Sequence, residues 1–137
     1  MEVGKMIRKR VWIFICIYFI LGLVIGYFTS IRADLPKNIY MIFDDAIPVI
    51  VSILLCVIFS KTIKDAGRNS IGLGVGLAFG HDIYWKVSLY FDLGKGNTGY
   101  IIDGIIQAIF TIVGVVVIVL ILQTIKSVFI KYITKKQ

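Results

Sequence analysis

The sequence predicts an all-α integral membrane protein, built as a bundle of four transmembrane helices, and three observations lead to this fold class. Hydrophobic residues make up 58% of the 137 residues and charged residues 17%, against about 45–50% and about 25% in soluble proteins. The apolar residues gather into runs of about 20, the length that crosses a hydrocarbon core of about 30 Å. The basic residues form three clusters that flank these runs. We expect a single membrane domain covering 1–137.

The positions of the positive charges predict the orientation of this domain. The formal net charge is +7, and 11 of the 15 basic residues fall in the three clusters. With four crossings all clusters lie on one side of the membrane. Short loops rich in Lys and Arg remain cytoplasmic, so both termini are expected on the cytoplasmic side of the plasma membrane. We expect these charges to attract anionic lipid headgroups rather than nucleic acid. The clusters are Lys5, Arg8, Lys9 and Arg10; Lys61, Lys64 and Arg68; and Lys126, Lys131, Lys135 and Lys136.

The first two predicted helices span about 11–29 and about 40–60. In the first, Gly22 and Gly26 form a small-xxx-small face that lets another helix approach closely. No small-x-small cleavage site follows this run, so we expect it to stay in the protein as a helix. Pro48 is expected to kink the second helix, because proline has no backbone donor.

The third and fourth predicted helices span about 70–91 and about 100–124, and a polar inner loop at 61–69 precedes the third. The third helix is long enough to cross only if three polar residues near its middle are accepted in the membrane. Without this crossing, the inner loop and the C-terminus would lie on opposite sides, against the distribution of positive charge. A re-entrant segment is the alternative.

The two outer loops resemble each other, which predicts that the bundle consists of two related helical hairpins. Asp34-Leu-Pro-Lys37 and Asp92-Leu-Gly-Lys95 each lead through an asparagine to a tyrosine, and an aspartate follows in the next helix. Parallel repeats of this kind, related by an axis along the membrane normal, occur in transporters. Coincidence between two short loops is the other explanation.

Gly72, Gly76 and Gly80 lie four residues apart, and therefore on one face of the third helix. Glycines at this spacing let a second backbone come close, and Gly22 and Gly26 offer the counterpart on the first helix. A nucleotide-binding loop is a poor interpretation, because no strand precedes these glycines. We expect the five glycines to pack helices together.

The polar residues of the third helix are the candidate site. Asp82 and Lys86 are spaced i, i+4 and are expected to pair on one helix face, while His81 is expected to point to the other side. An isolated charge in mid-membrane costs about 3 kcal/mol, so pairing is nearly required. The pair is either an internal lock on packing or a proton or cation site. The lone histidine either relays protons or hydrogen-bonds a neighbouring helix.

Six of the eight acidic residues fall on the predicted outer half of the chain. Asp44, Asp45 and Asp103 stand in the first turns of helices, where carboxylates meet free N–H groups, and capping explains part of the excess. The other interpretation is an acidic vestibule that attracts cations. The six residues are Asp34, Asp44, Asp45, Asp82, Asp92 and Asp103.

We expect no catalytic residues, metal site or cofactor. Cys16 and Cys56 are interpreted as small apolar core residues, since the cytoplasmic side is reducing and two cysteines do not complete a zinc site. A single histidine cannot form a multi-histidine metal site either.

The predicted function is that of a non-enzymatic subunit or accessory protein in a homo- or hetero-oligomeric membrane assembly. The lipid bilayer and other membrane helices are the expected partners. The alternative is a small proton or cation transporter or channel that uses intramembrane Asp82, Lys86 and His81, together with Asp103.

Overall fold

The structure of the protein, a computed structural model, describes residues 2–31, 39–92 and 98–136, and for 39–45 it describes the backbone alone. Within these ranges every element is helical, which confirms the prediction of an all-α protein. The elements are α1 (Glu2–Ile31), α2 (Ile39–Phe59), α3 (Ile63–Leu77), the π-helix η1 (Ala78–Ile83), α4 (Tyr84–Asp92) and α5 (Gly99–Thr134).

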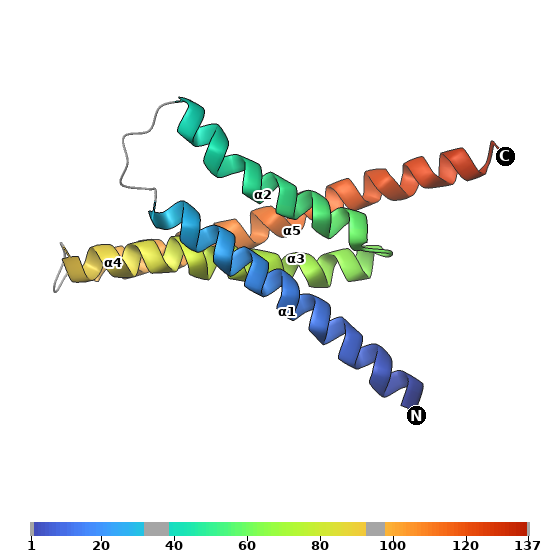
Figure 1. The fold of residues 1–137 in the computed structure, drawn as a ribbon, viewed down its shortest axis with the longest axis horizontal. Helices are drawn as coiled ribbons and strands as arrows, with labels where there is room; N and C mark the ends of the chain where they lie inside the picture. The colour runs from blue at the N-terminus through green and yellow to red at the C-terminus, as the bar shows by residue number, and fades with distance from the viewer. Residues whose placement is uncertain (1, 32–38, 93–97, 137) are drawn as a thin grey trace.

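The third helical segment is the centre of the arrangement. α3, η1 and α4 follow one another without a break, and we call this continuous segment, 63–92, the central rod. α1 crosses one side of the rod and α5 runs along another, and these two helices make its largest contacts. α2 makes smaller contacts with α1, α3 and α5, and its first half diverges from α1 (Figure 1).

Helix boundaries differ from the predicted ones mainly at the basic ends. α1 begins at Glu2 rather than near 11, and α5 continues to Thr134 rather than ending near 124. The predicted polar loop at 61–69 is wrong, because α3 already begins at Ile63. The hydroxyl of Thr62 accepts a hydrogen bond from the backbone N–H of Asp65 at 3.1 Å and caps this start. The spacing Thr-x-x-Asp resembles a capping box and is the signal that marks it.

The interior of the bundle is unusually polar and its surface unusually apolar. Large apolar side chains are exposed along the whole length of α1 and α5. Exposed apolar areas of this extent mark contact with a membrane or with other proteins. The apolar core is small and centres on Tyr18, Leu73, Leu77 and Val119. Among the side chains that the structure describes, the buried polar ones are Ser30, Ser52, Ser60, Asn69, Ser70, Asp82 and Gln123.

Two helices of the described chain, α1 and α5, are long and apolar enough to span a membrane. Only 17% of the most apolar stretch of each is buried inside the protein, whereas the core helix of a soluble protein would be mostly buried. α2 contributes a shorter apolar stretch, Ala46–Phe59. Its helix continues through Pro48.

The two ends of the bundle differ in charge. Both chain termini lie at the same end as the turn between α2 and α3, while the end of α1 and the start of α5 lie at the other (Figure 1). The three basic clusters stand at the start of α1, around the α2–α3 turn and in the last part of α5. They therefore gather at one end of the molecule.

Candidate functional site

Close backbone contact between α1 and α3 fixes the position of the central rod. A Cβ atom added to Gly76 would lie 2.2 Å from the carbonyl oxygen of Phe19, and one on Gly22 would lie 2.4 Å from that of Leu73. Only glycine permits this approach, because such separations are far below van der Waals contact. The predicted glycines that meet in this seam are Gly22, Gly26, Gly72, Gly76 and Gly80.

A second close approach brings α5 against the rod. A Cβ on Gly104 would lie 2.8 Å from the Cβ of Lys86, and one on Gly74 would lie 3.1 Å from the Cα of Ile112. The side chains that the rod presents to α5 therefore meet polar groups of α5 at short range. This is where the candidate site forms.

The site is carried by the π-helical turn η1, which contains His81 and Asp82. A π-helix closes its hydrogen bonds between residues five apart, and short π segments inside α-helices are frequent at functional sites. The wider turn changes the direction of the side chains relative to a regular α-helix. This π-helical turn is not among the elements predicted from the sequence.

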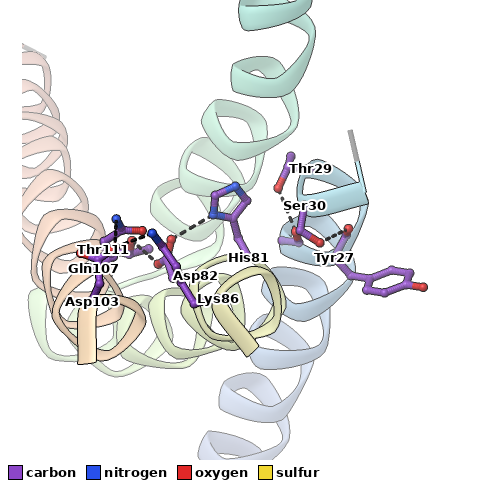
Figure 2. A network of polar contacts seen from close by, with 10 residues as sticks. Tyr27, Thr29, Ser30, His81, Asp82, Lys86, Asp103, Gln107 and Thr111 are labelled. Atoms are coloured by element: carbon purple, nitrogen blue, oxygen red, sulfur yellow. Dashed lines mark hydrogen bonds and ion pairs between the residues drawn. The ribbon is translucent and has the colours of Figure 1, made fainter. Parts of the chain in front are cut away.

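Asp82 is the centre of the polar network, and only 8% of its side chain is exposed. Its Oδ2 accepts a hydrogen bond from the Thr111 hydroxyl at 2.6 Å, and its Oδ1 lies 2.9 Å from Nδ1 of His81 (Figure 2). An ionised Asp82 would only accept hydrogen bonds, and Nδ1 would then be the donor in this contact. The expectation that His81 points away from Asp82 is therefore wrong.

Lys86 pairs with α5 rather than with its own helix. Its Nζ forms an ion pair with Oδ2 of Asp103, and the amide of Gln107 donates to the same oxygen at 3.3 Å. The Lys86 side chain is 15% exposed and that of Asp103 is 49% exposed. The predicted i, i+4 pair between Asp82 and Lys86 is wrong, because Gly104 lets α5 come close and Asp82 is already bonded to His81 and Thr111.

Two site residues of α5, Gln107 and Thr111, were not singled out from the sequence, and they lie on the same helix as the candidate Asp103. Asp103, Gln107 and Thr111 are each four residues apart, so they form one polar stripe along an otherwise apolar helix. Residues at this spacing share a helix face. That stripe is the signal that could have identified the face of α5 directed at the rod.

A cavity of about 320 Å³ opens beside Asp82, between α1, α2, η1 and α5. His81 borders it, and 40% of its side chain is exposed. Figure 2 shows His81 projecting from η1 between α1 and α2, with Asp82 between it and Thr111. The buried carboxylate can thus be approached from the side of the molecule. The lining includes Thr29, Ala46, Val49, His81, Asp82 and Thr111.

The acidic vestibule is only partly within the described residues. Asp34 lies outside them, as do most of the two similar loops, and so do the side chains of Asp44 and Asp45 in α2. Asp92 is exposed and accepts a hydrogen bond from the Ser88 hydroxyl at 3.3 Å. Of the six acidic residues, the structure brings Asp82 and Asp103 to the interface between the rod and α5.

A second polar cluster closes the basic end of α2. The ammonium of Lys126 donates to the carbonyl oxygens of Val57 at 2.8 Å, Ile58 at 3.1 Å and Ser60 at 2.9 Å. A cation here satisfies the free carbonyls at a helix C-terminus and interacts favourably with the helix dipole. The amide of Gln123 also donates to the Ser60 carbonyl at 3.3 Å.

The cysteines and possible metal ligands give a plain result. Cys56 is buried as predicted, whereas Cys16 is exposed, so its assignment to the core is wrong. Within the described ranges, no group of three or more His, Cys, Asp or Glu side chains is arranged to hold a metal ion.

The polar network around Asp82 can hold a proton between His81 and Asp82, or offer the second nitrogen of His81 to a group in the cavity.

Comparisons of the chain with protein-family models, curated proteins and solved structures found no match.

Proposed function

We propose that the protein is a multi-pass protein of the cell membrane, with four crossings and both termini in the cytoplasm, that acts as a non-enzymatic subunit of a homo- or hetero-oligomeric assembly. Polar side chains are buried inside the bundle and large apolar ones are exposed on its surface, the reverse of a soluble protein, and this distribution supports the membrane setting. Buried serines bond to carbonyls of their own helices, as Ser52 does to Val49 at 2.7 Å, and Asp82 bonds within the network. In lipid, polar groups must be satisfied inside the protein in this way.

The length and charge of the helices support four crossings. At 1.5 Å per residue the central rod is about 45 Å long, which exceeds the hydrocarbon thickness of about 30 Å. The gathering of the basic clusters at one end supports a cytoplasmic location for that end. The re-entrant alternative is less favoured, because the rod is helical throughout 63–92.

The observation that carries the assembly role is the exposure of His81 on an apolar side of the bundle. Among the described residues, Nε2 of this ring has no hydrogen-bond partner. In a lone subunit the His81–Asp82 pair would face acyl chains, where a charge costs about 2.5–3.5 kcal/mol. A helix of another subunit, packed over the opening of this cavity with one polar side chain inside it, would exclude lipid and give Nε2 a partner.

Cross-linking through this cavity tests the proposal. In a Cys16→Ser background, Ala46→Cys on the cavity wall is compared with Ile109→Cys, an exposed position on α5. We expect bifunctional thiol reagents to join Ala46→Cys to a second copy or to another membrane protein, and Ile109→Cys to remain unlinked. A monomer by native mass spectrometry, with no adduct at Ala46→Cys, contradicts the assembly role.

Proton or cation transport is the second candidate, and the hydrogen-bonded series His81, Asp82 and Thr111 beside an open cavity favours it. Purified protein in liposomes with an internal pH dye would then carry a flux that Asp82→Asn abolishes. Asp92→Asn, at an exposed carboxylate outside the network, is the matched control. Absence of flux from the folded wild-type assembly would rule this candidate out.

A further inference from the structure

The basic end of the bundle contains a groove that the polar network does not use. The first part of α1 leans away from the rod (Figure 1), and a cavity of about 430 Å³ lies between it and the α2–α3 turn. Residues from α1, from the end of α2 and from the start of α3 line it. They include Arg10, Phe14, Phe59, Lys61, Asp65 and Arg68.

The charge of this groove is uncompensated. Three cations, Arg10, Lys61 and Arg68, stand against the single carboxylate of Asp65. In the part of the chain that the structure describes, the ion pairs are His81–Asp82 and Lys86–Asp103, and neither involves these cations. The groove is therefore lined by three cations that are outside these ion pairs, and guanidinium groups bind phosphate oxygens well.

The apolar part of the groove follows the charged part in a fixed order. Phe14 lies one helical turn beyond Arg10 on α1, about 5–6 Å further along the axis. On the other wall, Phe59 ends α2 just before Lys61. Both aromatic side chains are exposed. On each wall a cation therefore stands nearer the basic end and an aromatic ring nearer the apolar middle of the bundle.

We propose that this groove binds one anionic phospholipid. The phosphate lies between Arg10, Lys61 and Arg68, and one acyl chain runs along Phe14 and Phe59. This inference rests on the proposed membrane setting. A soluble anion would use the cations alone and would leave the aromatic walls unoccupied, whereas a phospholipid matches both halves. Basic pockets at the cytoplasmic ends of membrane helices are suited to such headgroups.

Native mass spectrometry of the detergent-solubilised full chain, titrated with phosphatidylglycerol or phosphatidylcholine of identical acyl chains, tests the proposal. We expect the wild type to retain phosphatidylglycerol about thirtyfold more strongly, since the two net positive charges of the groove contribute about 1 kcal/mol each to the attraction of anionic lipid. The combined variant Arg10→Gln, Lys61→Gln, Arg68→Gln is expected to lose this preference.

The matched control removes the same charge at the same end. Lys131→Gln, Lys135→Gln and Lys136→Gln change exposed residues of the α5 end, and the lipid preference should stay within about twofold if general attraction is weak in detergent. An equal loss of the phosphatidylglycerol preference in both triple variants would overturn the proposal that the groove is the lipid site. The double variant Phe14→Ser, Phe59→Ser should lower the affinity for both lipids by about tenfold, which corresponds to about 1.4 kcal/mol of binding free energy.

Competition with a soluble anion tests whether the groove binds the whole lipid or only its phosphate. Glycerol 3-phosphate at the same concentration is expected not to displace phosphatidylglycerol, and displacement would show that the site takes a free phosphate instead. Carbonate extraction of membranes tests the membrane setting separately. Retention in the membrane without lipid preference would refute the groove alone, whereas release from the membrane would refute the proposed function.

Discussion

The two sides of the central rod are held by different means. Toward α1 the rod presents glycines, and backbone meets backbone along Gly72, Gly76 and Gly80. Toward α5 it presents Asp82 and Lys86, which bond to polar side chains of α5. In lipid, burial of apolar surface gives little drive for helix association, so close packing and interhelical hydrogen bonds take its place. Substitutions on the side toward α1 should therefore destabilise the protein by steric overlap, and substitutions on the side toward α5 by leaving polar groups unpaired.

The largest effect is expected at the glycine seam. Gly76→Ala places a methyl group 2.2 Å from the Phe19 carbonyl oxygen, and we expect a loss of about 3 kcal/mol or more in the free energy of unfolding, the upper end of overpacking costs. Gly114→Ala is the control, because nothing lies within 4 Å of its added Cβ. It should be neutral or slightly stabilising. Denaturant titration in mild detergent measures both, and equal stabilities would contradict the seam.

The ion pair should give the next effect. A double-mutant cycle with Lys86→Met and Asp103→Asn is expected to yield a coupling energy of about 1–2 kcal/mol, reduced from that of a fully buried pair because Asp103 is half exposed. A second cycle with Lys86→Met and Asp82→Asn should give less than about 0.5 kcal/mol. If the two values were reversed, the i, i+4 pair would be the correct one.

Thr111 tests the polar side without removing a charge. Thr111→Val keeps the shape and deletes the hydroxyl that donates to Asp82, so we expect a loss of about 1 kcal/mol, within the range of interhelical hydrogen bonds in membranes. Thr124→Val is the control, because its hydroxyl bonds to Leu120 of the same helix. A loss of the same size in both variants would mean that the hydrogen bond from Thr111 to Asp82 does not stabilise the contact between the rod and α5.

The smallest effect is expected where α2 attaches to α1. The Tyr18 hydroxyl donates to the Leu55 carbonyl at 3.2 Å, and Tyr18→Phe should cost about 0.5 kcal/mol, the lower limit for one neutral hydrogen bond. Hydrogen exchange should accelerate in 46–59 and stay unchanged in 63–77, since α2 has the smaller contacts. Tyr132→Phe, at an exposed position on α5, is the reference. Faster exchange throughout the chain would show that α2 is not a separate unit.

The helical fold could be predicted because its signals are local. Apolar runs mark the helices, and glycines at intervals of four mark a face that can approach a second backbone. The start of α3 could also have been predicted, because Thr62 and Asp65 have the spacing of a cap. These signals depend on residues within one or two turns of each other.

The partners of the polar side chains could not be predicted in the same way. Asp82 and Lys86 have a spacing that favours pairing in a regular α-helix, but the π-helical turn and the close approach of α5 at Gly104 decide their contacts instead. Both causes depend on tertiary structure. The stripe of Asp103, Gln107 and Thr111 indicates a polar face on α5, but not which element it meets.

The π-helical turn has a consequence for changes in chain length. A hydrogen-bonded turn that closes between residues five apart holds one residue more than an α-helical turn. Deleting Phe79, an exposed residue of η1, should therefore let the turn close as an α-helix while Gly72 and Lys86 keep their partners. Deleting Val75 would instead rotate one part of the rod against the other by about 100°. A single-residue deletion is thus expected to be better tolerated at 78–83 than in the α-helical parts, and folding yields of the two deletions would measure the difference.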